Sequence, residues 1–224
     1  GQSVSERVMI ISTRRRFIFV HIPTTGGTSM ALALEARAMK DDILIGDTPK
    51  ARRRKGRLKT VQTAGRLWKH ATLADVDGLI TPEQARDYFV FTLVRNPWDR
   101  MVSYYHWLRD QRFDHPAVEL AKCCDFSGFL NADETRTSFA THPFGRYVTT
   151  GQGQERCDLF IRLEEFAADV RPFEAHLGFP LAPLATVNRS TRNRDWRGYY
   201  SDDDAALVAH ICAVDIARFG YVFD

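Results

Sequence analysis

The sequence lacks an apolar run of the roughly 20 residues that a membrane-spanning helix needs, and its start lacks a signal-peptide core. We therefore expect a cytoplasmic protein. Because the chain begins with Gly-Gln rather than Met, a removed upstream anchor and a lumenal origin stay open. The few cysteines show neither Cys-x-x-Cys pairs nor a Cys/His ligand pattern, which argues against a zinc motif and favours reduced thiols. They are Cys123, Cys124, Cys157 and Cys212.

A large excess of charge is also missing. The net charge is only +3 over 224 residues, which does not favour nucleic acid or a membrane surface as a partner. Hydrophobic residues make up 44% and charged residues 26% of the chain, close to globular averages. This length and composition predict one globular domain over residues 1–224.

The usual phosphate-loop pattern, Gly-x-x-x-x-Gly-Lys-Ser/Thr, is absent because no lysine precedes Thr28 or Ser29. This absence argues against a P-loop kinase. What is present is a buried strand over residues 17–22, a turn marked by glycines, and a helix over residues 30–39. The turn residues from Thr25 to Ser29 can direct backbone N–H groups and a helix dipole at one phosphate or sulfate.

A second unit of this kind follows. Residues 88–94 predict a buried strand, and Pro97 suits the first turn of a helix. Arg95 emerges at the strand end, and Ser103 lies two helical turns further on. A guanidinium offers charge-assisted bonds to phosphate oxygens, and a hydroxyl adds a neutral donor.

The remaining segments carry weaker signals. We expect Thr81 and Pro82 to open a helix, Thr72 and Asp75 to cap a helix through residue 79, and Ser201 to cap a final one. Other expected elements are a strand over residues 158–163, a helix over 166–177 closed by a glycine, and a loop at 141–147. The apolar face of the final helix is expected to comprise Leu207, Val208, Ile211 and residues 214–219. The basic residues 41–59 predict a surface loop. This loop is either a solvated surface of no special role or a binding surface for an anionic acceptor or for the donor phosphates.

Strands followed by helices, with two anion-binding turns at strand exits, predict a mainly parallel α/β sheet with ligands at its carboxyl edge. His70 lies in a loop ahead of a predicted helix. Its pKa range makes histidine a natural general base near neutral pH, so His70 is a candidate for proton abstraction. His106 and His142 are the next candidates.

The two turns together resemble sulfotransferases that use 3′-phosphoadenosine 5′-phosphosulfate (PAPS). The carbohydrate sulfotransferases carry His-Ile-Pro-Lys-Thr-Gly-Gly-Thr-Ser, and here the stretch from His21 to Ser29 reads His-Ile-Pro-Thr-Thr-Gly-Gly-Thr-Ser. The second family motif, Arg-Asn-Pro-Trp-x-Arg-x-Val-Ser-x-Tyr, matches the stretch from Arg95 to Tyr105. The resemblance implies a P-loop-like, three-layer α/β fold.

The resemblance also implies roles for single residues. The 5′-phosphosulfate would be held by Thr24, Thr25, Gly26, Gly27, Thr28 and Ser29. The 3′-phosphate would be held by Arg95 and Ser103, with Ser190 or Arg192 reaching it from a late basic loop. His70 would take the proton of an acceptor hydroxyl, and adenosine 3′,5′-bisphosphate (PAP) would leave without help from a metal.

One position departs from the family motif. A lysine that contacts the phosphosulfate is replaced by Thr24, which carries no charge. Two functions follow: an active sulfotransferase acting on a carbohydrate or similar small hydroxyl-bearing acceptor, or a PAPS- and PAP-binding protein with weak turnover. A P-loop kinase is the third and least favoured reading. The acceptor and the oligomeric state are not fixed by the sequence.

Overall fold

The computed structural model describes residues 7–181 and 195–224. The chain forms two compact units, which are described separately. The first comprises residues 1–94 and 145–189, and the second comprises residues 95–144 and 190–224. The single sulfotransferase-like domain expected from the sequence stays a prediction.

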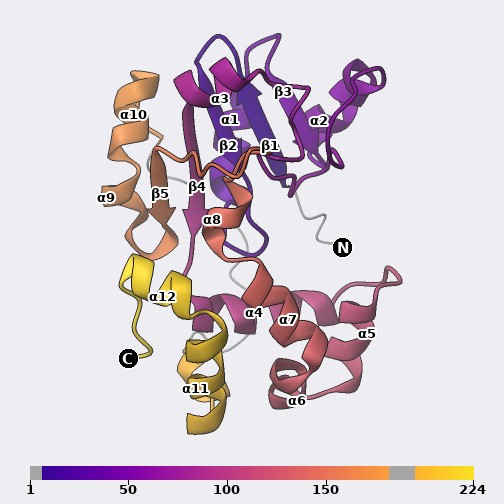
Figure 1. Cartoon of the computed structure of the whole chain (residues 1–224), viewed down its shortest axis with the longest axis vertical. Coiled ribbons are helices and arrows are strands. Elements are labelled where there is room, and N and C mark those ends of the chain that lie inside the picture. Colours follow the sequence, from indigo (N-terminus) through magenta and orange to yellow (C-terminus); the bar gives the residue numbers. More distant parts are fainter. Residues whose placement is uncertain (1–6, 182–194) are drawn as a thin grey trace. The chain divides into compact units, whose positions relative to one another are not determined.

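A five-stranded sheet is the centre of the first unit (Figure 1). Its order is β3-β1-β2-β4-β5, and β2, β4 and β5 run parallel to one another. β1 is antiparallel to both of its neighbours, so it alone points against the other four strands. The predicted mainly parallel sheet is therefore confirmed. The strands are β1 Val8–Ser12, β2 Phe17–Val20, β3 Ile43–Gly46, β4 Phe89–Val94 and β5 Leu159–Arg162.

The basic segment that was predicted as a loop is ordered, and that prediction was wrong. It forms β3, the helix α2 (Pro49–Arg54) and the 3₁₀ turn η1 (Lys55–Leu58). β3 forms because Leu44 and Ile45 are buried against β1 and pair with it. Thr48 then caps α2, since its side chain accepts a hydrogen bond from the Ala51 N–H at 3.2 Å.

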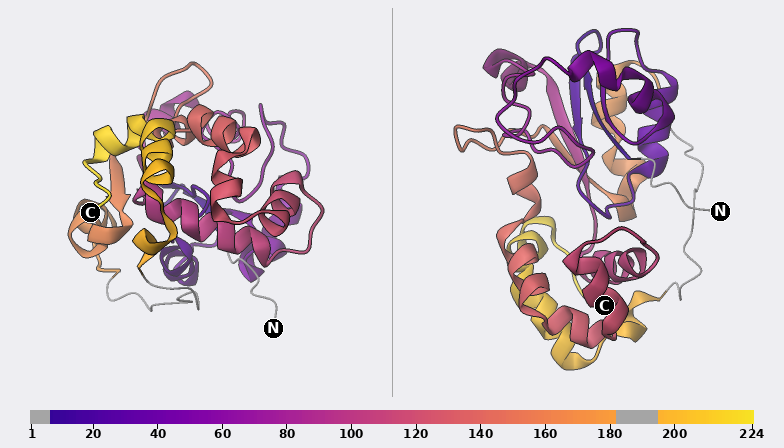
Figure 2. Two further views of the ribbon diagram at one scale, coloured as in Figure 1. Left: turned by 90° about the horizontal axis from the view of Figure 1, so that it is seen from below. Right: turned by 90° about the vertical axis from the view of Figure 1, so that its right-hand side faces the viewer.

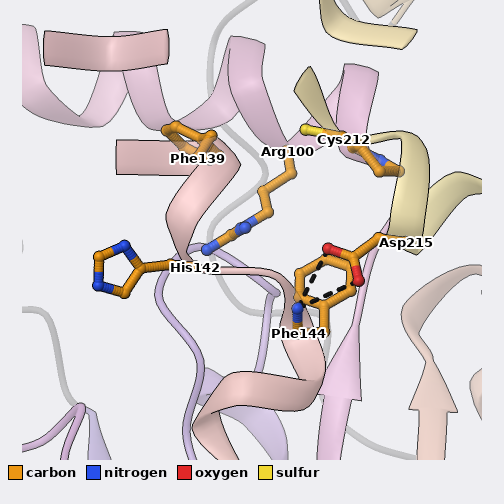
Figure 3. Close-up of a pocket in the computed structure, with 7 residues that line it drawn as sticks. Arg100, Phe139, His142, Phe144, Cys212 and Asp215 are labelled. Carbon is orange, nitrogen blue, oxygen red and sulfur yellow. Dashed lines mark hydrogen bonds between the residues drawn. The ribbon is translucent and has the colours of Figure 1, made fainter. Parts of the chain in front are cut away.

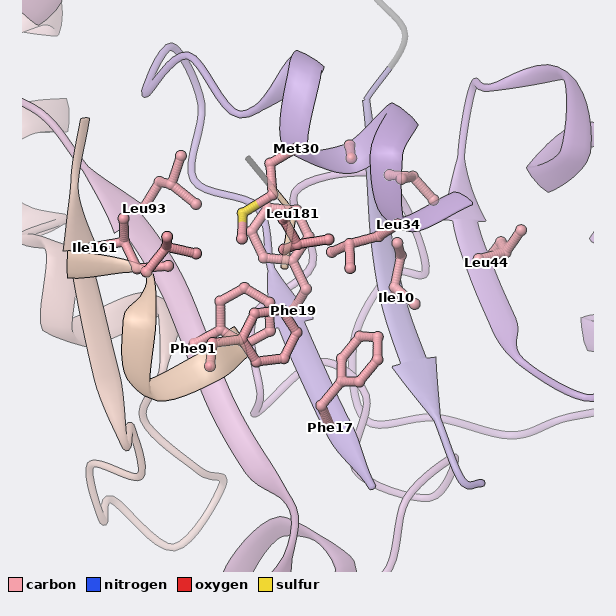
Figure 4. Packing of buried hydrophobic residues seen from close by; sticks show 14 of the residues in the cluster. Ile10, Phe17, Phe19, Met30, Leu34, Leu44, Phe91, Leu93, Ile161 and Leu181 are labelled. Carbon is pink, nitrogen blue, oxygen red and sulfur yellow. The ribbon is translucent and has the colours of Figure 1, made fainter. Parts of the chain in front are cut away.

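Both faces of the sheet are covered, which gives the three layers. On one face, α1 (Thr28–Ala36), α9 (Phe166–Asp169) and α10 (Arg171–Leu177) pack on apolar side chains of the strands. Figure 2, right, shows α1 and the α9–α10 pair on the same side. Figure 4 shows the aromatic centre of this layer, where the Phe19 and Phe91 rings stack at 5.1 Å. The other face is covered by α3 (Pro82–Asp87) and by residues 71–80.

Two local predictions about helices had different outcomes. α3 begins after Thr81, which is its N-cap as expected, with Pro82 in its first turn; Gln84 completes a capping box that was not predicted. Thr72 and Asp75 also exchange side-chain bonds with each other's N–H groups, at 2.9 and 3.1 Å, but they close a turn and no helix follows. The helix predicted through residue 79 was therefore wrong. The reciprocal bonds alone stabilise one turn and do not specify that a helix continues.

One expected helix is divided. Residues 166–177 contain α9 and α10, with the 3₁₀ turn η2 (Leu163–Glu165) ahead of them. Pro172 lies in the first turn of α10, where its ring and its missing N–H prevent a continuous helix. Gly178 closes α10 at φ +83°, as expected.

The second unit is helical in its described residues, around a core that contains Trp98, Met101 and Phe129. The loop predicted over residues 141–147 was wrong, since it contains the end of α7 and then α8. The final helix expected after Ser201 is divided at Cys212, and its expected apolar face is confirmed only in part. Val208 is buried, and Leu207, Ile211 and Ile216 pack against the core, whereas Val214 is 65% exposed. The elements are α4 Pro97–Arg109, α5 Pro116–Cys123, α6 Phe126–Asn131, α7 Asp133–Thr141, α8 Phe144–Tyr147 (which leads back into the first unit), η3 Trp196–Tyr199, α11 Asp202–Ile211 and α12 Ala213–Phe219. None of the helices in residues 7–181 and 195–224 has the length and hydropathy needed to cross a bilayer.

Candidate active site

The predicted strand-turn-helix arrangement is present between β2 and α1. The turn has two residues in the left-handed region, Thr24 at φ +60° and Gly26 at φ +77°. The Thr25 hydroxyl donates to the Ile22 carbonyl at 2.9 Å inside the buried part of the turn. A β-branched residue is strained in this region, so Thr24 is held there by its surroundings.

The glycine turn leads directly into the N-terminus of α1. Its N-cap is Gly27, which offers no side-chain acceptor, and the first turn holds no acidic residue. The first intrahelical bond runs from the Ala31 N–H to the Gly27 carbonyl at 2.8 Å, so the amides ahead of Ala31 point out of the N-terminal end of the helix. Such amides and the helix dipole together attract an anion such as phosphate or sulfate.

A buried histidine lies directly beneath this turn. His21 is 1% exposed, and a Cβ placed on Gly27 would come within 2.8 Å of its Nε2. The absence of a side chain on Gly27 therefore lets the turn rest on the imidazole. Among the described residues, neither ring nitrogen of His21 has a hydrogen-bond partner. His21 is the first residue of the family motif, but the sequence predicted no role for it.

His70 lies against His21, as the second ring of a stacked pair. The ring centroids are 5.3 Å apart with an interplanar angle of 21°. The His70 Nδ1 lies 2.9 Å from the His21 carbonyl oxygen, which can only accept, so Nδ1 carries the hydrogen and Nε2 carries the lone pair. That tautomer is the one a general base at Nε2 requires.

Both imidazoles are neutral at pH 7. Burial lowers the pKa of His70 to about 3, with nearby Arg7 and Lys69 adding to the effect. Burial and the neighbouring His70 lower the pKa of His21 well below its usual 6.5. His70 is therefore always available in its basic form near neutral pH, but its intrinsic basicity is low.

The cation nearest to His70 in sequence is already engaged. Lys69 Nζ forms an ion pair with Asp47 Oδ2 at 2.9 Å, and both side chains are about three-quarters buried. The same carboxylate accepts the Arg7 N–H at 2.8 Å. Lys69 is thus anchored to the residues just ahead of α2, which reduces its suitability as a replacement for the family lysine.

The parallel strands fix where the second motif begins. β2 and β4 pair in parallel with Val20 opposite Thr92, so both strands end at the same edge of the sheet. The glycine turn follows β2 there, and the chain leaves β4 at Val94 and continues into Arg95. This is the carboxyl edge at which α/β sheets bind ligands.

Within the second unit, Arg95 is held at the start of α4. Its Nε donates to Asp99 Oδ2 at 3.0 Å, and both side chains are largely buried. Asn96 caps the helix by accepting the Trp98 N–H at 3.0 Å. Ser103 is half-buried and lies one turn beyond Asp99 on the same face of α4, since residues four apart are neighbours on a helix.

The other sequence candidates are dispersed. His106 lies on α4, its ring edge-on to Tyr199 at 5.2 Å, and exposed His142 follows α7 and contacts the Ser138 carbonyl through Nδ1 at 2.8 Å. At the end of β5, Arg162 forms a bidentate ion pair with Asp169, which lowers the pKa of that carboxyl. Ser190 and Arg192 lie outside the described residues.

A hollow in the second unit is filled by the protein itself (Figure 3). The Arg100 guanidinium lies 5.1 Å from the Phe139 ring centre and 5.0 Å from that of Phe144. Asp215 accepts the Phe144 N–H through both oxygens at 3.1 Å. These contacts make Arg100 a packing residue of this unit.

Comparison with known proteins gives a family and two distant structural likenesses. A model described as the sulfotransferase family matches residues 7–219. The crystal structure of mouse sulfotransferase SULT7A1 complexed with PAP is 16% identical, with 89% of this chain and 82% of that chain covered and a TM-score of 0.47. A sulfotransferase from Alicyclobacillus acidocaldarius is 24% identical over 61% of this chain and 56% of that one, with a TM-score of 0.34. No curated protein matches the chain.

Proposed function

The chain belongs to the sulfotransferase family, and from this premise we propose that it transfers a sulfuryl group from PAPS to a hydroxyl of a carbohydrate-like acceptor. The observation that carries the proposal is the glycine turn at the N-terminus of α1, with His70 stacked on the histidine beneath it. The amides of the turn suit an oxyanion, and the neutral imidazole suits a hydroxyl proton. Both lie in one unit of the chain.

The donor site is proposed residue by residue. Thr24, Thr25, Gly26, Gly27, Thr28 and Ser29 would hold the 5′-phosphosulfate. The turn fits this group because the first turn of α1 holds no acidic residue and the helix dipole favours an anion at its N-terminus. Arg95 and Ser103 would bind the 3′-phosphate, with Ser190 or Arg192 assisting.

PAPS would supply the sulfuryl group and a phosphate leaving group. His70 Nε2 would accept the acceptor's proton while the hydroxyl oxygen bonds to sulfur and the bond from sulfur to the 5′-phosphate oxygen breaks. Because the pKa of His70 is about 3, we propose that the proton moves late, once the attacking hydroxyl has become acidic. The α1 amides would stabilise the charge that develops on the leaving phosphate, which becomes part of PAP.

Thr24 favours a second candidate, a PAPS- and PAP-binding protein with weak turnover. A cation on a leaving phosphate contributes about 3 kcal/mol, or about 100-fold in rate, and Thr24 provides no charge. The carbohydrate class of the acceptor and a cytoplasmic location belong to the proposal as well.

Two assays test these proposals. We expect PAP to raise the melting temperature of the chain and ATP or GTP at equal concentration to raise it far less. A larger shift with ATP or GTP would support a kinase and contradict the proposal. Transfer of labelled sulfate from PAPS to a panel of oligosaccharides then separates the active enzyme from the weak-turnover binder.

A further inference from the structure

Two adjacent cysteines lie at the end of α5, in the second unit. Cys123 is the last residue of the helix and is exposed, and Cys124 follows it as the C-cap. Their Sγ atoms are 3.4 Å apart. Neighbouring side chains inside a helix do not face each other, so the sulfurs meet here because Cys124 leaves the helical conformation, at φ -116° and ψ 153°.

The main chain around the pair is held by hydrogen bonds. The Cys124 N–H donates to the Leu120 carbonyl at 3.1 Å, and the Cys124 carbonyl accepts the Tyr105 hydroxyl at 2.7 Å. The Cys123 thiol also donates to the Leu120 carbonyl, at 3.4 Å. The two thiols are therefore brought together by the fold before any ligand binds, which lowers the entropy cost of holding one.

A glycine keeps space beside Cys124. A Cβ placed on Gly128, in the first turn of α6, would lie 3.1 Å from Asp125 Oδ1, 3.2 Å from Cys124 Cβ and 3.8 Å from Cys124 Sγ. Gly128 does not have a positive φ, so its backbone does not require glycine, and alanine would favour the helix by about 1 kcal/mol. The missing side chain leaves room next to the thiol.

The distance between the sulfurs indicates what the pair can bind. A disulfide needs sulfurs about 2.05 Å apart and Cα atoms about 4.4–6.8 Å apart, whereas the Cα atoms of adjacent residues are only about 3.8 Å apart. At the observed separation of 3.4 Å, bonds of about 2.3 Å from both sulfurs to one shared atom would meet at about 95°. The geometry therefore favours a single bridging atom over a disulfide.

The number of ligands indicates which atom this is. A structural zinc ion takes four ligands at tetrahedral angles, which would place two sulfurs about 3.8 Å apart. In the part of the chain that the structure describes, the pair belongs to no group of three or more side chains that could hold a metal ion. Trivalent arsenic forms three bonds at angles close to a right angle. In a monosubstituted arsenical one of these bonds is made to carbon, so two thiols complete the set.

We propose that Cys123 and Cys124 form a dithiol site that binds monosubstituted trivalent arsenicals. In the reaction with an arsine oxide, two S–H bonds and the As=O bond break, two As–S bonds form, and the oxygen leaves with both protons as water. Arsenic stays trivalent and neither sulfur is oxidised. This site goes beyond sulfuryl transfer and uses no residue of the proposed donor site.

The pair suits a group that takes both sulfurs better than one that takes a single sulfur. The hydrogen bond with Cys123 raises the pKa of the Cys124 thiol above its usual value, and the nearby Asp125 carboxylate adds to the effect. Such a thiol is a weak nucleophile near neutral pH. Once one As–S bond has formed, however, the second sulfur reacts within the same molecule, at a high effective concentration.

The test is the binding of phenylarsine oxide, followed by intact-protein mass spectrometry in the presence of excess glutathione as a monothiol competitor. We expect the parent chain to keep one phenylarsenic group against glutathione and to release it to ethanedithiol. Cys123→Ser and Cys124→Ser should each lower the affinity about tenfold or more, because one As–S bond is lost in each. Cys123 is exposed, so Cys123→Ser should keep the parent's fold, which circular dichroism checks.

Matched controls separate the geometry of the pair from the mere presence of thiols. Cys157→Ser and Cys212→Ser should bind phenylarsine oxide as the parent does. The double variant Lys122→Cys with Cys124→Ser keeps two adjacent cysteines, but both then lie within α5, where neighbours point apart. It should bind as weakly as Cys124→Ser alone. Binding by this double variant that equals the parent's, or unchanged binding by Cys123→Ser, would overturn the inference.

Discussion

The buried histidine pair should make the stability of the chain fall steeply with acid. His70 has a pKa of about 3 when folded and about 6.5 when unfolded. Between these values the unfolded chain binds a proton that the folded chain does not, so the free energy of unfolding decreases as the pH falls. The stabilisation is fully present above pH 6.5 and is lost progressively toward pH 3.

The size of the effect follows from linkage. One such group changes the free energy of unfolding by about 1.4 kcal/mol per pH unit inside this window, so lowering the pH from 7 to 5 costs about 2 kcal/mol for His70. The pKa of His21 is shifted in the same direction and adds to the loss. The measurement is urea unfolding at several pH values between 7 and 5, followed by circular dichroism.

The variant His70→Gln isolates this contribution. Between pH 7 and 5, its free energy of unfolding should fall by about 2 kcal/mol less than that of the parent, because glutamine cannot be protonated in the unfolded state. His210→Gln replaces an exposed histidine on α11 and should follow the parent. If the parent and the His70→Gln variant lose the same free energy of unfolding between pH 7 and 5, the loss does not come from His70.

Other predictions concern the donor site. Thr24→Asn, which is not β-branched at φ +60°, serves as the uncharged control for Thr24→Lys. Only Thr24→Lys should raise labelled-PAPS turnover, and its ammonium group should cost stability in the absence of an anion because position 24 is buried; equal turnover by the two variants would argue against a missing charge. Gly27→Ala should weaken PAP binding at least tenfold in calorimetry, because the added Cβ would displace His21. The control Gly56→Ala, which has no atom within 4 Å of its added Cβ, should bind PAP as the parent does. Equal affinities of the two variants would contradict the packing of Gly27 on His21. Arg95→Lys should weaken PAP about tenfold and leave adenosine 5′-phosphate, which has no 3′-phosphate, unchanged; an equal loss for both would exclude the 3′-phosphate role.

The strand-turn-helix units were predictable because their signals are local. An apolar run followed by proline or glycine and then by helix formers specifies β2 with α1, and β4 with α4, with little help from distant residues. β1 and β3 could not be identified in this way. Each is short, and each depends on pairing with strands elsewhere in the chain, which propensity does not describe.

The candidate site was predictable to a similar degree. The sequence offered the turn and His70 as candidates, because phosphate and proton chemistry need particular residue types at a strand exit, and their roles stay predictions. It gave no role to His21, since the contact with Gly27, the stacking on His70 and the lowered pKa values arise only when segments 49 residues apart meet.

The turn between β2 and α1 also bears on the energetics of recognition. Its left-handed residues and the bond from the Thr25 hydroxyl to the Ile22 carbonyl set the direction of the amides in the folded chain. The ordering entropy of this segment is therefore lost during folding, and little of it remains to be lost when an anion arrives. A preorganised cradle of this kind should associate with a small entropic penalty and a fast on-rate, with no slow rearrangement after encounter.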